Sequence, residues 1–167
     1  MDSGERPLLG RDVWYGFSFL IPPGFPIVDT RLVISQWKQS GLEGSPLVAQ
    51  RFRNGRHYVT LRDLETLGRW REEVDLPPIV PGRWNDMVYH LRFAADSSGL
   101  VEVWMNGQRV VRSTGAIASP RGKDRFYHKV GLYRDRMAEP MTIYIDNYAI
   151  GESFEDVDPA RPSTDGS

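Results

Sequence analysis

The sequence of 167 residues contains no cysteine. That absence excludes disulfide bridges, thiolate metal sites and a cysteine nucleophile. An excess of either charge is also missing, because 21 basic and 22 acidic side chains give a formal net charge of −1. A dedicated nucleic-acid-binding domain normally carries a basic excess, so we expect no nucleic-acid partner.

Long apolar runs are missing as well. The longest, at 13–21, ends at Pro22-Pro23 and is far shorter than the ~20 residues that cross a bilayer, so no membrane partner is expected. The first ten residues, MDSGERPLLG, are acidic and lack the apolar segment of a signal peptide. Length and a hydrophobic content of 40% predict one globular domain.

Helical periodicity is nearly absent, and only 61–71 favours a short helical turn, which Gly68 interrupts. Most of the remaining chain alternates apolar and polar residues with period two, the pattern of strands with one face in a core. We predict nine strands and a tenth near the end, at about 13–21, 31–38, 47–53, 56–62, 69–75, 85–95, 100–105, 108–113, 127–134 and 141–150.

Tight turns join several of these strands. Asn54-Gly55 and Asn106-Gly107 each stand between two alternating runs, which is a strong hairpin signal because both turn residues must accept a positive φ. Many short strands with such turns predict an all-β sandwich of two antiparallel sheets over residues 1–151. The acidic, aperiodic segment 152–167 is predicted to be a disordered tail.

Polar side chains gather on the strand faces opposite the predicted core. In 31–38, for example, Gln36 and Lys38 share one face, while Val33, Ser35 and Trp37 share the other. If the strands are neighbours, these polar faces form a groove that suits an extended, acidic, hydroxylated ligand, because Arg binds carboxylates with two parallel hydrogen bonds. The alternative is ordinary solvent exposure. The candidates are Gln36, Lys38, Arg51, Arg53, Tyr58, Arg62, Tyr127, Lys129 and Tyr133.

Several common catalytic arrangements are not indicated. Ser35 lacks a G-x-S-x-G context, which argues against a serine hydrolase. His57, His90 and His128 lie on three different strands, so no zinc-type spacing is present, and His128 is expected in the core or at an edge. Glu102 stands alone on its strand, which is a poor match to the paired carboxylates of glycoside hydrolases.

A family resemblance rests on two strands. Residues 127–134 (YHKVGLYR) resemble the Y-x-K-x-G-x-Y strand of jelly-roll, concanavalin-like polysaccharide lyases, a group that includes alginate, glucuronan and heparin-lyase-like enzymes. Gln36-Trp37-Lys38 is similar to their Q-x-H or Q-W strand. The resemblance extends over about 13–151 through WYGFSF at 14–19, WND at 84–86, VWMNG at 103–107 and YIDN at 144–147.

This resemblance implies β-elimination on a uronate-containing polysaccharide. Gln36, with Arg51 or Arg53, would stabilise the charge that develops at the uronate carboxylate. Tyr133, which matches the last Tyr of the motif, would act as both acid and base. A tyrosine at its reference pKa of about 10 is a poor base at neutral pH, and a neighbouring cation such as Lys129 favours the phenolate. Tyr127, Tyr58, Arg62 and Lys38 would contact substrate, and no cofactor is required.

Two departures from the family pattern bear on catalysis. Lys38 stands where alginate-lyase relatives have His, and an early Arg-x-Glu strand is absent or reduced to Glu5-Arg6-Pro7. Either the first strand is missing from this chain or activity is lost. The resemblance further implies a monomer that is secreted or periplasmic. A structural calcium ion near Asp146 is a further expectation, although the sequence contains no loop of clustered carboxylates that would support it.

Two other functions remain open. One is a non-catalytic carbohydrate-binding sandwich, in which Arg51 and Trp104 would contact the glycan. The other is a purely structural sandwich within a larger protein.

Overall fold

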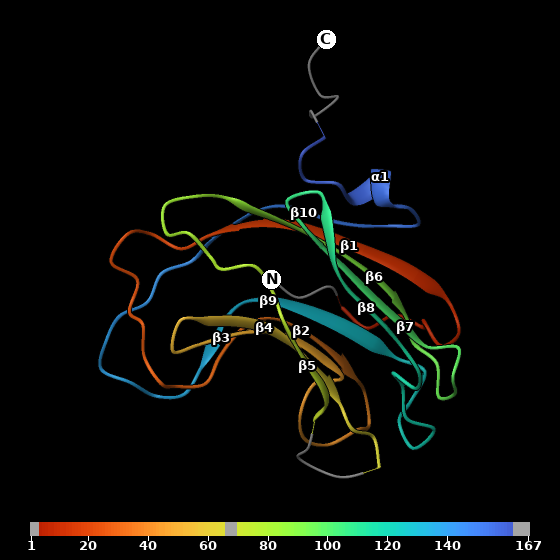
Figure 1. Ribbon diagram of the computed structural model, residues 1–167. Helices are drawn as coiled ribbons and strands as arrows, with labels where there is room; N and C mark the ends of the chain where they lie inside the picture. Colours follow the sequence, from red (N-terminus) through yellow and green to blue (C-terminus); the bar gives the residue numbers. More distant parts are fainter. Residues whose placement is uncertain (1–3, 66–69, 162–167) are drawn as a thin grey trace.

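The protein forms a sandwich of two five-stranded antiparallel sheets, as seen in a computed structural model that describes residues 4–65 and 70–161 (Figure 1). The predicted all-β jelly-roll class is confirmed. The elements are β1 (Asp12–Leu20), β2 (Leu32–Gln39), β3 (Val48–Arg53), β4 (Arg56–Arg62), β5 (Trp70–Asp75), β6 (Asn85–Arg92), β7 (Leu100–Met105), β8 (Gln108–Thr114), β9 (Phe126–Arg134), β10 (Tyr144–Gly151) and α1 (Phe154–Val157).

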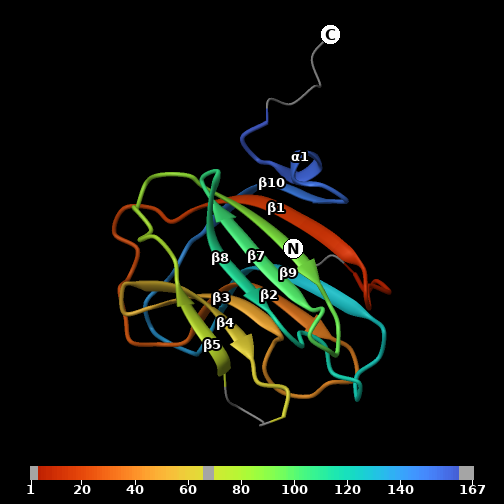
Figure 2. The same ribbon diagram turned by 45° about the vertical axis from the view of Figure 1, so that its right-hand side comes forward.

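The first sheet has the strand order β10-β1-β6-β7-β8, and the second has the order β5-β4-β3-β2-β9. Figure 2 shows the sheets as two layers, with α1 on the outer side of the first sheet. Strands β2 and β9 lie far apart in the sequence but are paired in the second sheet. This pairing brings the two strands that carry the family resemblance side by side.

The inner faces of both sheets supply one hydrophobic core. Tyr15, Phe17 and Phe19 of β1 are fully buried, and Trp37 of β2 contacts Tyr15 from the opposite sheet. Each large side chain removed from water contributes about 2–3 kcal/mol, so this layer holds the sheets together. Trp37 belongs to the core, which leaves the outer face of β2 to its polar residues.

The two Asn-Gly hairpins predicted from the sequence are confirmed. Asn54 and Asn106 have φ of 49° and 51°, and Gly55 and Gly107 have φ of 80° and 79°. The flanking strands pair through Arg53 with Arg56 and through Met105 with Gln108. Two consecutive residues of positive φ match the twist of the strands that they join.

A β-bulge corrects one face assignment. The register of β2 against both β3 and β9 shifts between Val33 and Ser35, and Gly131 on β9 adopts a φ of 140° at this level. A bulge changes which side of the sheet the following residues face. Val33 therefore lies on the same outer face as Gln36, rather than with the buried Ser35 and Trp37.

The structure differs from two local predictions. The chain continues as strand β4 to Arg62 and resumes as β5 at Trp70, so the described part of 61–71 contains no helix, and residues 66–69 lie outside the described residues. In the segment predicted to be a disordered tail, Ser153 caps α1 and Val157 is buried. Residues 162–167 lie outside the described residues. No described helix has the length and apolar composition needed to cross a bilayer.

We predict that Gly16→Ala destabilises the fold by displacing α1. A Cβ at Gly16 would lie 1.7 Å from the Val157 carbonyl oxygen, so either β1 or α1 must move. Such overpacking typically lowers the free energy of unfolding by about 1–3 kcal/mol. Thermal denaturation measures the change, with Val157→Ala as a second variant that removes most of the buried side chain by which α1 is anchored. An unchanged Tm in both variants would contradict this packing.

Candidate active site

Six of the nine candidate residues line one open groove on the outer face of the second sheet. Its volume of about 660 Å³ lies within the range of small-ligand sites. These six residues come from three adjacent strands, β3, β2 and β9. The six residues are Gln36, Lys38, Arg51, Tyr127, Lys129 and Tyr133.

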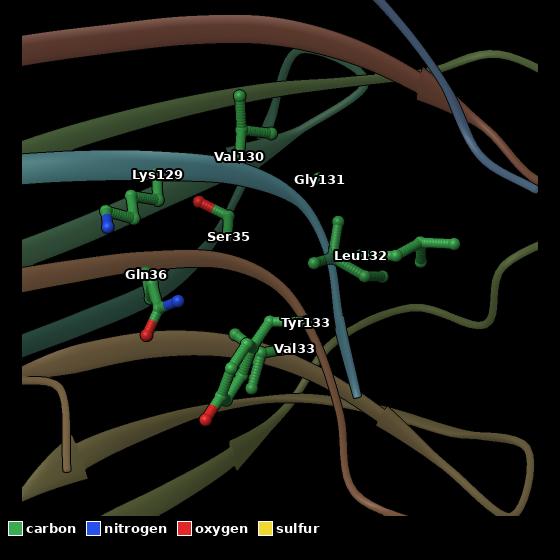
Figure 3. Close-up of a pocket in the computed structure, with 9 residues that line it drawn as sticks. Val33, Ser35, Gln36, Lys129, Val130, Gly131, Leu132 and Tyr133 are labelled. Atoms are coloured by element: carbon green, nitrogen blue, oxygen red, sulfur yellow. The ribbon is translucent and has the colours of Figure 1, made fainter. Parts of the chain in front are cut away.

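The pairing of β2 with β9 sets the order of these side chains along the groove. Gln36 pairs with Lys129, and Lys38 pairs with Tyr127 on the next outward-facing position. Tyr133 pairs with Val33 beyond the bulge. Figure 3 shows the side chains of Gln36, Lys129 and Tyr133 on one side of the sheet and Val130 on the other. The amide, the ammonium and the phenol therefore face a common space.

Arg51 is held rigidly at the floor of the groove. Its side chain is buried, its Nε donates to Thr60 Oγ1 at 2.9 Å, and its guanidinium lies 4.5 Å from the ring centre of Trp70. Burial lowers the pKa of Arg51, but an arginine stays charged in proteins. With Nε engaged, the terminal Nη groups are left to bind an anion. Trp70 was not predicted from the sequence as a site residue, because it stands alone among charged residues.

Tyr133 reaches into the groove with half of its surface exposed, at 52%. The Arg31 guanidinium carbon lies 5.2 Å from the centre of the Tyr133 ring, and Arg31 also forms an ion pair with Asp135. Arg31 lines the groove and was not singled out in the sequence, where a charged residue at the start of a strand resembles any exposed arginine. A cation therefore flanks the phenol.

The other three candidates do not join this group. Arg53 binds Asp29 with an Nε–Oδ1 distance of 2.6 Å, and it lines a separate pocket of about 290 Å³ together with Tyr58. The ring of Tyr58 is covered by Arg56, at 4.2 Å from its centre. Arg62 is buried and donates to the Ser45 carbonyl oxygen at 2.9 Å, so it supports the loop at 44–46 that borders the groove.

Two histidines are buried between the sheets rather than exposed in the groove. His128 Nε2 lies 2.7 Å from Ser35 Oγ, which confirms the expected interior position. His57 Nε2 lies 2.9 Å from Gln50 Nε2, and its Nδ1 lies 2.9 Å from the Pro77 carbonyl oxygen. Burial lowers the pKa of His57 to about 4 and that of His128 to about 3. Both rings are neutral at physiological pH and serve the core.

The outer face of the first sheet carries a separate polar network. Glu102 of β7 accepts hydrogen bonds from Arg109 and Arg112 and contacts His90 Nδ1 at 3.0 Å. Trp104 lies on the same strand, with its ring centre 5.4 Å from that of Trp14. Glu102 is therefore engaged in a structural network, and Trp104 lies on the sheet opposite to Arg51, so the two cannot contact one glycan in the groove.

The structural calcium ion considered near Asp146 stays a prediction. Asp146 Oδ1 accepts a hydrogen bond from the backbone of Asn147, which has a φ of 54°. Among residues 4–65 and 70–161, no cluster of three or more His, Asp or Glu side chains is arranged to hold a metal ion. Asp146 thus stabilises the backbone of β10 at the point where its register against β1 shifts.

The family model described as polysaccharide lyase matches residues 3–149. The chain belongs to the polysaccharide lyase family. This family match covers both motif strands and every residue of the groove. No curated protein sequence matches the chain.

Solved polysaccharide lyases share the fold of this family member. An endo-β-1,4-glucuronan lyase from the fungus Trichoderma reesei superposes with a TM-score of 0.75 at 21% identity, over 92% of this chain and 74% of that enzyme. An alginate lyase from Pseudomonas aeruginosa gives 0.59 at 19% identity, over 85% and 65%. An alginate lyase from Alteromonas sp. 272 gives 0.58 at 14% identity, over 84% and 71%.

Proposed function

We propose that this polysaccharide lyase family member cleaves an acidic, uronate-containing polysaccharide by β-elimination. The observation that carries the proposal is the single groove that gathers Gln36, Arg51, Lys129 and Tyr133. The structural neighbours are named as lyases of glucuronan and alginate, both of which are acidic polymers. We further propose that the protein works as a monomer, without a cofactor, and outside the cytoplasm, where such polymers occur.

Charge stabilisation at the uronate carboxylate is the first requirement of the reaction. The C5 proton is weakly acidic while the adjacent carboxylate keeps its full negative charge, so donors aimed at that carboxylate stabilise the enolate that forms. In our proposal the Gln36 amide and the Arg51 Nη groups supply these donors. Thr60 and Trp70 fix Arg51 in advance, so little side-chain entropy is lost when the substrate binds.

Tyr133 carries the proton in the proposed reaction. Its deprotonated oxygen takes the C5 proton, the electron pair forms the C4–C5 double bond, and the C4–O4 bond breaks. The phenol then returns the proton to the departing O4, so the tyrosine ends the cycle as it began. Arg31 and Lys129 place positive charge beside the negative charge that moves through these steps.

The two sequence departures have different structural settings. Lys38 faces the groove, so it contributes positive charge where alginate-lyase relatives have His. At the N-terminus, Arg6 forms an antiparallel bridge with Phe126 at the start of β9. In the proposed mechanism neither position is needed for proton transfer, because Tyr133 alone serves as acid and base.

A panel of acidic polysaccharides tests the proposed function. The protein is incubated with glucuronan, alginate and a glycosaminoglycan, and the ultraviolet absorbance of the unsaturated uronate product is followed. We expect a rise with at least one of these polymers. Absence of a rise with all three would contradict lyase activity toward this substrate class.

The replacement of His by Lys38 favours a second candidate, a non-catalytic carbohydrate-binding domain, if elimination needs that His in addition to Tyr133. In this case the groove would bind the same polymers through Arg51 and the lysines without completing the elimination. Retention on an affinity gel that contains the polymer, together with no unsaturated product, would identify this function.

We predict that Arg51→Lys lowers kcat/KM by about tenfold or more, which corresponds to roughly 1.4 kcal/mol of lost transition-state stabilisation. A lysine keeps the charge but cannot offer two parallel donors to a carboxylate or keep the contact with Thr60. Arg53→Lys on the same strand is the matched control, since Arg53 lies outside the groove. Equal losses in both variants would argue against the role of Arg51.

A further inference from the structure

All three lysines of the sequence line one cavity, although the chain contains 21 basic residues in total. Lys38, Lys123 and Lys129 border a hollow of about 620 Å³ that adjoins the groove and shares Lys38, Tyr127 and Lys129 with it. Elsewhere in the chain every cationic side chain other than histidine is an arginine. The ammonium groups are thus concentrated beside the candidate active site.

The loop that carries Lys123 is fixed in place. The buried Gln39 side chain donates to the carbonyl oxygens of Ser119 and Lys123, at 3.0 and 3.2 Å, and accepts from the Ser119 backbone at 2.9 Å. A Cβ at Gly122 would lie 2.5 Å from Gln39, so the loop lies tightly on this amide. The loop therefore presents Lys123 at a defined position.

The charges of Lys38 and Lys123 are available to a ligand, in contrast to those of the arginines at the opposite end of the sheet. No carboxylate of the described residues lies within ion-pairing distance of Lys38 or Lys123. At the opposite end of the sheet, Arg53 and Arg56 are already paired with acidic residues. Binding an anion at Lys38 or Lys123 breaks no ion pair with a described residue, whereas binding at Arg53 or Arg56 would compete with one.

We propose that Lys38 and Lys123 form a second carboxylate-binding subsite, which holds a uronate next to the sugar at Tyr133. This inference rests on the proposed function, because it adds a neighbouring sugar of the same acidic polymer. Glu5 and Glu43 also line the hollow. Glu5 accepts a hydrogen bond from Ser40, and neither carboxylate lies within ion-pairing distance of Lys38 or Lys123. The subsite therefore still attracts an anion. It makes the end of the groove near the lysines more positive than the other end.

Binding measurements on an inactive background test this subsite. Tyr133→Phe is combined with Lys123→Gln or with Lys38→Gln, and affinity for glucuronan and alginate is measured by calorimetry, with carboxyl-reduced polymer as the uncharged comparison. We expect each lysine substitution to weaken binding of at least one acidic polymer by about three- to tenfold, a change of up to about 1.4 kcal/mol, and to leave binding of the reduced polymer unchanged. Arg121→Gln is the control, since Arg121 lies two residues from Lys123 but outside the hollow.

The outcomes separate this inference from the lyase proposal. If the wild-type protein makes no unsaturated product but the lysine variants bind the acidic polymers less well, the subsite stands and the elimination fails. If the lysine variants bind like the Tyr133→Phe parent, or if Arg121→Gln causes the same loss, the subsite is wrong even when lyase activity is present. Lack of binding to every acidic polymer tested also overturns it.

Discussion

Tyr133→Phe is expected to reduce the rate of elimination by at least 10²–10⁴-fold, the range that a positioned acid–base group contributes. The substitution removes one oxygen and leaves the ring, so the contact between Arg31 and the ring face is retained. Because Tyr133 is half exposed, its hydroxyl contributes little to the core, and Tm should not change. Initial rates from the absorbance of the unsaturated product, with thermal denaturation in parallel, measure both effects.

Tyr144→Phe provides the matched control. Tyr144 has the same exposed fraction as Tyr133, 52%, but it lies on β10 of the first sheet. The control should keep the full rate. If Tyr133→Phe also keeps the full rate, another group transfers the proton, and the role assigned to the last tyrosine of the motif is wrong.

Acidification is expected to weaken the fold well above the pH at which carboxylates usually protonate. His57 is buried and neutral, and its pKa is lowered to about 4 from an unfolded value near 6.5. Below pH 6.5 His57 binds a proton in the unfolded chain but stays neutral in the folded chain. The stability that His57 contributes is therefore fully present above pH 6.5 and is lost as the pH falls toward 4, by about 3 kcal/mol in total.

His128 adds to the same loss. Burial lowers its pKa to about 3, so its contribution continues to fall over a wider range of pH. Each neutral buried histidine changes the free energy of unfolding by up to about 1.4 kcal/mol per pH unit below 6.5. Two such groups in one core predict a steep dependence between pH 6 and pH 4.5.

Urea denaturation at several pH values measures this dependence. In His57→Gln the titrating group is gone, while an amide can still bond to Gln50 or to the Pro77 carbonyl oxygen. The slope of the free energy of unfolding between pH 6 and pH 4.5 should be smaller in the variant, whatever its stability at pH 7. Equal slopes in variant and wild type would contradict the neutral buried state of His57.

The period-two pattern predicted most of the fold because strand identity depends on local alternation. All ten strands appear in the structure within a few residues of the predicted bounds, and both Asn-Gly turns take the expected conformation. The bulge at Val33–Ser35 was not predicted, because an extra residue changes which side of the sheet the side chains face without changing the local composition. The docking of α1 was missed because it depends on space above Gly16, which only the assembled sheet provides.

The candidate site was predictable where the family motif and strand alternation agreed. Gln36, Lys129 and Tyr133 lie on strands whose outward faces could be deduced, and the pairing of β2 with β9 joins them. Arg53 was grouped with Arg51 by alternation alone, although Asp29 binds Arg53 at the end of the sheet. Lys123 could not be found in this way, since its position depends on long-range bonds from Gln39 to an irregular loop.

The mass of the products tests the central claim, elimination in the groove of the second sheet, most directly. The wild-type protein is incubated with the polymer that gives the largest rise in absorbance, and the products are analysed by mass spectrometry. Elimination predicts that the masses of the two fragments sum to that of the parent chain, with a double bond on one fragment, and that Tyr133→Phe yields neither fragment. Fragments that together exceed the parent by the mass of one water would show hydrolysis and contradict the proposed chemistry.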